Sequence, residues 1–342
     1  MNTRDVLAAT AGEPRLAVEA ELRPVAGTRF QATGFPDLGP ARYQRPDGTE
    51  MLLVESAQSM ANRLETLCWD GGANDGAGDL VDTLAGMPYV KVLGDNGRML
   101  TSSILEAHRV NSPYILEGRD VTFLDRLKEE ARGLEWGPVD PARLAGMVFR
   151  YDPNSLVHGA FLAKKELAGG RLRLTRALSA FVEASDVRET ESGGVKNDHV
   201  DPSGDTRQGF GNVPFHRTEF TAAYIAASFT LDLALLRGYR LPEAALEFLV
   251  ALSLWKVQRF LSGPVRYRTA CDLEPVGAPH VVRPAGLVLP DLTTLHADVR
   301  SSLVACRDAG LFAEPPVTEI RWQPKRGKEK AASGAEAEEE LG

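Results

Sequence analysis

The side chains of this chain that could perform chemistry are most concentrated between Gly193 and Arg217, in the segment GGVKNDHVDPSGDTRQGFGNVPFHR. The segment holds three carboxylates, two imidazoles and three cations, set among glycines, prolines and asparagines that favour turns. Such a mixture suits a metal site, a cleaving carboxylate, or a loop that touches an anionic partner. The spacing of the side chains helps to separate these possibilities.

The spacing does not match a common metal site. The carboxylates are Asp198, Asp201 and Asp205. They lack the alternate-residue spacing and the closing glutamate of a calcium-binding loop. His199 and His216 have no cysteine near them, and no H-E-x-x-H motif occurs in the chain. We therefore expect no metal and no other cofactor, and we interpret both histidines as exposed loop residues.

Motifs of common enzyme sites are also missing. The chain has no G-x-S-x-G nucleophile turn, no Walker A sequence and no strand-borne G-x-G-x-x-G. The segment GGANDGAGDL is similar to a phosphate-binding loop in composition alone. These absences weaken an enzymatic interpretation without excluding it.

Basic charge is distributed unevenly. Residues 164–176 include five basic side chains against one acidic one, and residues 255–268 include four and none. Arginine binds phosphate through paired hydrogen bonds and aromatic rings stack on bases, so Tyr267 between Arg266 and Arg268 suits single-stranded RNA. Cations at a helix end or on a solvated strand face give the same pattern without a ligand, so both interpretations stay open.

The overall composition narrows the class of protein. A formal net charge of −8 over 342 residues argues against indiscriminate coating of nucleic acid, so any such site would be a local patch. The three distant cysteines, Cys68, Cys271 and Cys306, indicate buried thiols in a reducing compartment, the cytoplasm. No apolar run suits a signal peptide or a membrane span. We expect a folded region at 1–324 and a disordered tail at 325–342.

Hydrophobic periodicity predicts an α+β fold. The predicted elements are a strand at Met51–Val54, a helix from Ala57, a helix over 154–170, one long strand over 171–183 with Arg176 on its apolar side, a partner strand over 223–233, a helix from Pro242 to Gly263 and a final strand at 317–322. The order strand, helix, strands, helix, strand is that of a ferredoxin-like core, here with long insertions.

Five segments carry a resemblance to a known family: LLVESAQSMANRLE, TSSILEAHRVNSPYI, DPNSLVHGAFLA, FVEASDVRE and PFHRTEFTAAYI. Through them the chain resembles the backbone subunit of type I-G (formerly I-U) CRISPR effector complexes, the Cas-seven group also called Csb-one, within the RAMP superfamily. The resemblance extends over residues 14–322 in one order along the chain.

The resemblance implies a fold and a role. The fold would be a modified RNA-recognition-motif core with a β-hairpin thumb, and 188–217 would be the inserted thumb loop. Several copies would polymerise along one CRISPR guide RNA (crRNA) and present it for pairing with target DNA. Further partners would be the large subunit, a fused five/six-type subunit and a recruited helicase-nuclease, with no membrane involved.

The resemblance also gives the basic residues a ligand. We expect contacts to the RNA backbone from Lys164, Lys165, Arg171, Arg173, Arg266 and Arg268, with Gln58, Asn62 and Arg63 as secondary candidates. In the thumb loop, Lys196, His199, Arg207, His216 and Arg217 can meet phosphate. Charge reversal at Arg171 and Arg173 should then abolish assembly on the guide without unfolding the subunit.

Two other functions remain open. In the first, a loop aspartate among Asp198, Asp201 and Asp205 cleaves target RNA, as in type III complexes. In the second, the chain is a metabolic enzyme and 188–217 is the lid of its active site. An enclosed pocket with convergent polar groups would favour the enzyme, whereas an open basic groove would favour the RNA-binding subunit. On the RNA-binding interpretation we expect no catalytic residue.

Overall fold

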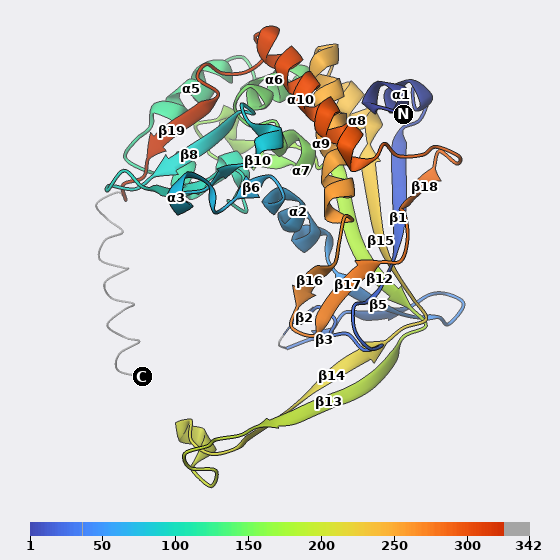
Figure 1. The fold of residues 1–342 in the computed structure, drawn as a ribbon. Coiled ribbons are helices and arrows are strands. Elements are labelled where there is room, and N and C mark those ends of the chain that lie inside the picture. Colours follow the sequence, from blue (N-terminus) through green and yellow to red (C-terminus); the bar gives the residue numbers. More distant parts are fainter. Residues whose placement is uncertain (36, 325–342) are drawn as a thin grey trace.

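The computed structural model describes residues 1–35 and 37–324, so the tail expected at 325–342 lies outside the described residues. Within them the centre of the fold is an eight-stranded sheet (Figure 1). Its order is β16, β17, β1, β15, β12, β5 and β4, and β18 also pairs with β1. The bounds are β1 Arg15–Pro24, β4 Arg42–Gln44, β5 Glu50–Glu55, β12 Leu178–Ser185, β15 Tyr224–Asp232, β16 Val265–Arg268, β17 Cys271–Pro275 and β18 His280–Arg283.

Four of these strands and two helices form a ferredoxin-like core. In chain order they are β1, α2 (Ala57–Thr66), β12, β15, α9 (Glu243–Phe260) and β17. In the sheet the four strands lie in the order β17, β1, β15, β12, and every neighbouring pair is antiparallel. This is the β-α-β-β-α-β arrangement of RNA-recognition-motif domains, so the predicted α+β class with a modified core of this type is confirmed. The strand predicted at Met51–Val54 is β5, an addition beside β12, and the first core strand is β1.

The helices α2 and α9 cover one face of the sheet, and α10 (Leu292–Asp308) packs on the outer side of α9 (Figure 1). Strand β1 alternates between the two faces, and its Leu16 and Val18 lie against Leu254 and Val257 of α9. Helix α9 is buried almost all round because the sheet lies on one side of it and α10 on the other. The hydrophobic core therefore lies between the sheet and the helices. Its packing fixes the position of the sheet edge and of the base of the thumb.

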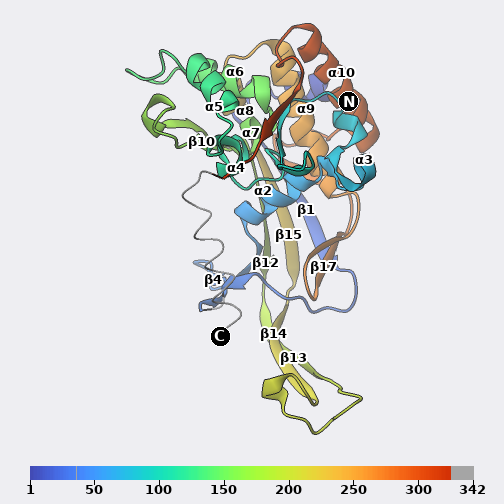
Figure 2. The same cartoon turned by 90° about the vertical axis from the view of Figure 1, so that its left-hand side faces the viewer.

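The thumb is a two-stranded ribbon that projects far beyond the sheet (Figures 1 and 2). Strand β13 (Arg188–Lys196) follows β12, β14 (Val213–Thr221) leads into β15, and the two pair along their whole lengths. The predicted hairpin is confirmed. Much of the segment predicted as a loop is regular strand, however, and only the tip at 197–212 is irregular. Glycine allows the close pairing, since a Cβ at Gly193 would lie 2.7 Å from the carbonyl oxygen of Phe215.

The long insertion after α2 folds as a second, smaller layer beside the helices (Figure 1). Its elements are β6 Trp69–Asp70, α3 Ala73–Gly76, β7 Asp79–Leu80, η1 Asp82–Leu84, β8 Tyr89–Leu93, β9 Met99–Ser102, η2 Arg109–Asn111, α4 Pro113–Leu116, α5 Thr122–Glu130, α6 Pro141–Tyr151, α7 Asn154–His158, β10 Ala160–Leu162, η3 Ala168–Gly170 and β11 Leu172–Leu174. The predicted final strand is β19 (Val317–Arg321), which joins this layer in parallel with β8.

Two predicted elements are wrong. The helix predicted over 154–170 ends at His158, because Gly159 has a φ of +82° and its backbone passes so close to Arg176 that a Cβ would lie 2.9 Å from that residue's amide nitrogen. The chain then forms the hairpin of β10 and β11. The long strand predicted over 171–183 is broken into β11 and β12, and Arg176 between them donates to the Ala57 carbonyl at the start of α2.

The remaining elements are α1 Thr3–Ala9, β2 Gly34–Phe35, β3 Gly39–Pro40, α8 Leu233–Gly238 and, in the tip of the thumb, η4 Thr206–Gln208. All three cysteines are free and buried, as the sequence indicated. None of the helices in the described part of the chain combines the length and the apolar character needed to cross a bilayer.

Candidate nucleic-acid interface

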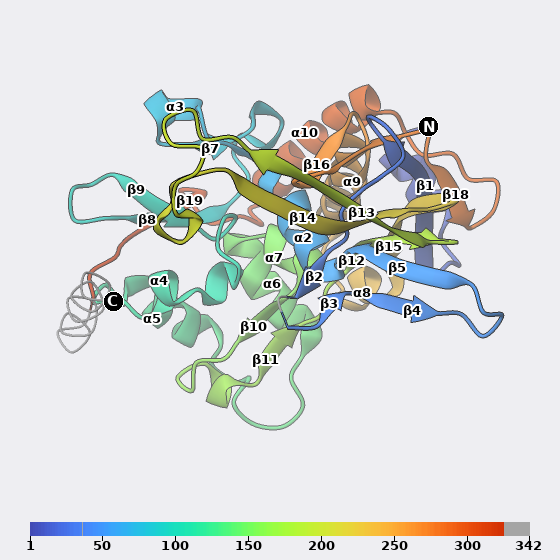
Figure 3. The ribbon, with the colours of Figure 1, turned by 90° about the horizontal axis from the view of Figure 1, so that it is seen from below.

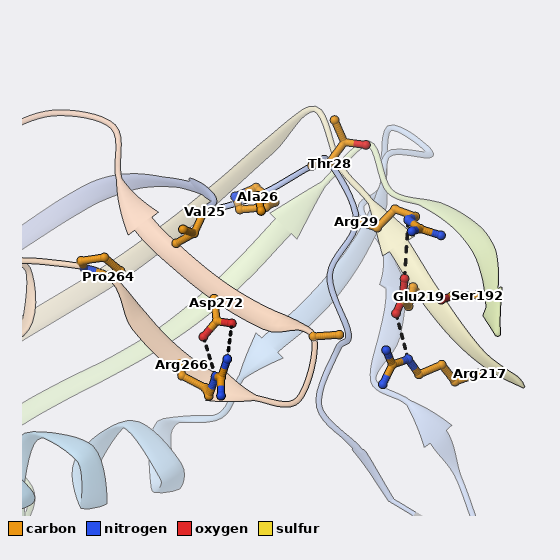
Figure 4. A pocket seen from close by; sticks show the side chains of 13 residues that line it. Val25, Ala26, Thr28, Arg29, Ser192, Arg217, Glu219, Pro264, Arg266 and Asp272 are labelled. Atoms are coloured by element: carbon orange, nitrogen blue, oxygen red, sulfur yellow. Dashed lines mark hydrogen bonds and ion pairs between the residues drawn. The ribbon is translucent and has the colours of Figure 1, made fainter. Parts of the chain in front are cut away.

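A hollow of about 610 Å³ lies at the base of the thumb (Figure 4). Its walls are the loop 24–29, the end of β14 near the sheet, and the hairpin of β16 and β17. It shares Pro264 with a hollow of about 470 Å³ beside the ends of α2 and α9, and Arg217 with one of about 430 Å³ beside the loop 31–34. We call the three together the arginine cleft, because their lining includes Arg29, Arg63, Arg217, Arg259, Arg266 and Arg268.

Glu219 holds two of these arginines at the thumb's base. Its carboxylate accepts a hydrogen bond of 2.9 Å from Nε of Arg217 and lies 3.7 Å from Nε of Arg29 (Figure 4). Glu219 is only 3% exposed because β14 passes beneath the loop that carries Arg29. A buried carboxylate fixes the guanidiniums beside it, and the donors that it does not use remain for a ligand.

Glu55 plays the same part at the end of β5. This carboxylate is 2% exposed, accepts from Arg268 and lies 3.7 Å from Arg63. Arg268 also donates to the Gln31 carbonyl, and Arg63 lies over the ring of Tyr267 with 5.0 Å between guanidinium carbon and ring centre. The two arginines therefore bind the loop 31–34, α2 and β16 together at the cleft's floor.

The third ion pair lies at the outer rim. Arg266 on β16 donates to both carboxylate oxygens of Asp272 on β17, at 2.9 and 3.1 Å (Figure 4). The hydrogen bond from Arg266 lowers the pKa of Asp272 below its usual range. Both groups are accessible to water, so the pair orients Arg266 more than it stabilises the fold.

The arginine cleft has an excess of positive charge in an acidic protein. Six guanidiniums surround it against the carboxylates of Glu55, Glu219 and Asp272, which leaves three positive charges in excess. The remaining donors are arranged along a continuous concave surface at the root of the thumb. Such an array can bind the phosphates of an extended polyanion without contacting its bases.

The structure divides the residues predicted to contact RNA into two groups. Arg63, Arg266 and Arg268 lie in the arginine cleft with Arg217. The other group lies on the hairpin of β10 and β11, which two views show well away from β16 and β17, with helices between them (Figures 2 and 3). That group consists of Lys164, Lys165, Arg171 and Arg173. A single groove through both groups is not what the structure shows.

The hairpin group is engaged with its own surroundings. Lys164 pairs with Glu117 at 2.8 Å, and Lys165 is exposed at the turn. Arg171 donates to the carbonyls of Leu134 and Gly137, at 2.6 and 2.9 Å. Arg173 lies over the ring of Phe161, 4.8 Å from its centre. Arg171 was predicted on the solvated face of a long strand over 171–183. It instead precedes β11 and holds a loop of the insertion, because that strand is broken between β11 and β12.

The other predicted residues fall between these groups. On α2, Gln58 accepts a hydrogen bond of 2.9 Å from Arg176 and Asn62 is exposed. On the thumb, Lys196, His199, Arg207 and His216 are exposed along the ribbon and its tip, whereas Arg217 lies at its root. Lys256, part of the basic run 255–268, is fully buried and donates to Asn154. It therefore belongs to the core and not to a ligand site.

The aspartates of the thumb tip organise its turns. Asp198 accepts from the amides of Val200 and Gly211, at 2.8 and 2.7 Å, and these backbone bonds lower its pKa. Asp201 accepts from Ser203, and Asp205 caps the short helix η4 (Thr206–Gln208). Among the residues that the structure describes, no three acidic, histidine or cysteine side chains gather as metal ligands.

The sequence did not reveal several members of the cleft. Arg29, Arg259, Glu55 and Glu219 come from separate segments, and none was predicted as a site residue. Glu55 and Glu219 lie in two of the segments that carry the family resemblance, and Arg259 lies in the basic run 255–268. Their partnership appears only after folding, when the loop after β1, the end of β5 and the root of β14 meet.

Comparison with known proteins places the chain in a family. Its residues 16–189, just over half of the chain, match the family described as CRISPR-associated protein GSU0053. No curated protein is similar to it in sequence. Among solved structures, "CRISPR RNA-guided surveillance complex, pre-nicking" has 15% identity and a TM-score of 0.39, covering 86% of this chain and 89% of that one. Csc2 of Thermofilum pendens has 10% identity and a TM-score of 0.30, covering 86% and 77%.

Both TM-scores lie below 0.5, so neither likeness supports a conclusion about this chain. The family match does not depend on these structural comparisons, because it is a match of sequence. It covers β1, α2 and the insertion, up to the first strand of the thumb. The chain belongs to the family of CRISPR-associated protein GSU0053.

Proposed function

We propose that this protein is a crRNA-binding backbone subunit of a type I-G CRISPR effector complex, and that the arginine cleft holds the sugar-phosphate backbone of the guide. The observation that carries the proposal is the arginine cleft at the root of a projecting β-ribbon. Membership of a CRISPR-associated family supports it. Several copies would line up along one guide, and target DNA would pair with the bases that face outward.

The chemistry of the cleft suits a guide of any sequence. Arginines recognise phosphates through their positive charge and the direction of their hydrogen bonds. The carboxylates of Glu55 and Glu219 hold the arginine side chains in place before the RNA binds. Binding then costs less side-chain entropy than it would for free arginines. Phosphate contacts carry no base information, so sequence specificity is left to pairing with the target.

The thumb gives each copy a reach beyond its own cleft. It carries Lys196, Arg207 and His216 on an extended ribbon, while Arg217 at its root lies in the cleft. A ribbon of this length can pass over the guide toward the next copy. We propose that the large subunit, the fused five/six-type subunit and a recruited helicase-nuclease complete the complex in the cytoplasm.

In this proposal the chain itself does not cut nucleic acid. The tip aspartates favour that choice, because Asp198 has its oxygens engaged by backbone amides and Asp205 caps a helix. A metabolic enzyme with the thumb as a lid is less well supported. The hollows at the thumb's base join into one surface lined by arginines, and the thumb projects away from them.

Purification from cells that express a CRISPR array tests the proposal. We expect the full-length protein to copurify with repeat-spacer RNA in large particles, seen by a high absorbance ratio at 260 and 280 nm and by sequencing of the bound RNA. The double substitution Arg29→Glu and Arg266→Glu should remove that RNA, while Arg300→Glu on the exposed side of α10 should retain it. A nucleic-acid-free monomer, obtained even with the partner proteins present, would refute the proposal.

A further inference from the structure

Trp136 is the most exposed large aromatic side chain in the described part of the chain, at 90% of its possible surface. It lies in the loop between α5 and α6, and that loop is braced on both sides. Arg171 donates to the Leu134 and Gly137 carbonyls, and Arg143 donates to the Arg132 carbonyl. The indole is therefore held out in solvent by a loop that two arginines fix in shape.

A second aromatic side chain lies on the neighbouring hairpin. Phe161 on β10 is 43% exposed and pairs across the hairpin with Arg173 on β11. Arg173 lies on the exposed side of β11, between the buried Leu172 and Leu174. Arg171 precedes the strand, and its hydrogen bonds to the Leu134 and Gly137 carbonyls join the hairpin to the loop of Trp136. Trp136, Arg171, Arg173 and Phe161 thus form one surface, which we call the stacking patch.

The composition of the stacking patch favours a nucleic acid over a protein partner. Two guanidiniums lie beside its two rings, and the Arg173 guanidinium lies 4.8 Å from the centre of the Phe161 ring. Glu135, in the same loop as Trp136, accepts from the Gly133 amide, and Glu166 lies at the hairpin turn. Aromatic faces beside arginines are the arrangement by which proteins hold single strands without reading their sequence.

A hollow of about 520 Å³ adjoins the hairpin turn, and its lining includes two lysines, Lys164 and Lys165, and two carboxylates, Glu117 and Glu166. Lys164 is paired with Glu117, while the exposed Lys165 adds a cation at the edge of the stacking patch. A strand that stacks on Trp136 and Phe161 can place its phosphates along this edge.

We propose that the stacking patch binds a single-stranded nucleic acid other than the guide. The hairpin of β10 and β11 that carries part of it lies well away from β16, which lines the arginine cleft (Figure 3). One molecule of the protein can therefore hold the guide and a second strand at the same time. The proposal goes beyond the guide-binding function, because it assigns a second ligand of the same chemical class to a separate surface.

Titration of the guide-bound full-length assembly with labelled oligothymidine and oligouridine that cannot pair with the guide tests the proposal. Trp136→Ala and Arg173→Glu should each lower the affinity about tenfold, the effect expected for one lost stack or one reversed contact. Trp136→Phe, which keeps a stacking face, should recover most of the affinity, and Arg300→Glu should have no effect. Comparing the two oligomers shows whether the second strand is DNA or RNA.

The content of guide RNA separates this proposal from the previous one. In the Trp136→Ala protein the absorbance ratio and particle size should equal those of the unmodified protein. Oligomer affinity that is unchanged by Trp136→Ala and Arg173→Glu overturns the proposal. So does smaller particle size at unchanged oligomer affinity, which would make the stacking patch a protein contact. If no guide copurifies at all, the same titration on the nucleic-acid-free protein still decides the question.

Discussion

Arginine side chains have different roles in the arginine cleft and in the stacking patch. In the cleft, buried carboxylates hold the arginines, and the guanidiniums supply the surface that meets a ligand. In the patch, Arg171 donates to backbone carbonyls and Arg173 lies over one face of Phe161, so the exposed ring of Trp136 is the main surface for a ligand. The cleft arginines come from several distant segments, whereas the patch arginines come from one. A count of basic residues along the sequence therefore finds both patch arginines, but of the six cleft arginines only the three in the run 255–268.

The largest expected difference between the two regions is in stability. Glu55→Ala leaves Arg63 and Arg268 without their carboxylate, which should lower the free energy of unfolding by about 3 kcal/mol, the low end for a broken buried ion pair. The low end applies because both arginines keep part of their side chains in water. Trp136→Ala should change it by less than about 0.5 kcal/mol, as a surface substitution does.

Urea unfolding of the two variants measures this difference, with Arg300→Ala as the control. A loss of similar size at Glu55 and Trp136 would contradict the distinction between a cleft built into the core and a patch built on the surface.

The next largest effect should be on guide affinity. Arg29 and Arg266 have 53% and 75% of their side chains exposed, so they can be replaced with little cost to the fold. Each charged hydrogen bond to phosphate is worth about 1.5 to 3 kcal/mol, so single alanine substitutions should weaken RNA binding about tenfold or more. The salt dependence of binding should also become less steep. Affinity measured at several salt concentrations checks both expectations, and an unchanged slope would mean that these arginines do not touch phosphate.

Charge reversal at Arg171 and Arg173 separates the sequence-based hypothesis from the structural one. The sequence predicted that this change abolishes assembly on the guide. Because neither residue lines the arginine cleft, and the hairpin that carries them lies apart from its walls, we now expect the guide to be retained. We expect a moderate loss of stability, about 1 kcal/mol, from the two backbone hydrogen bonds of Arg171. RNA content and the melting temperature of the double variant decide between the two hypotheses.

Much of the fold could be predicted from periodicity. Alternation of apolar and polar residues identified β15, and the apolar helix predicted before Gly263 is α9. Both could be found because the local order of apolar residues reflects which sides of an element are buried. The break between β11 and β12 could not be predicted. Alternation continues across it, and only the hydrogen bonds of Arg176 to α2 show why the chain leaves the sheet.

The candidate site was less predictable than the fold. Arg266 and Arg268 were found because an aromatic residue between two arginines is a local pattern. Glu219 and Arg29 were not, because their partnership joins residues far apart in the chain and depends on the position where the thumb leaves the sheet. Lys256 belongs to the basic run 255–268 but is buried against Asn154 and His158, so the charge of a run does not show which of its members reach the surface.

The smallest expected effect concerns Asp272 at the rim of the cleft. This carboxylate competes with phosphate for Arg266, so Asp272→Asn should strengthen RNA binding slightly, about two- to threefold, as for a weak exposed ion pair. Because Arg266 lowers the pKa of Asp272, the pair's contribution to stability is complete above the pKa of the unfolded chain, near 3.9, and is lost only as the pH falls through the lower folded value. RNA affinity and unfolding of the two proteins should therefore differ by a constant amount between pH 5 and 8. A difference that grows across that range would mean that another group, and not Asp272, controls Arg266.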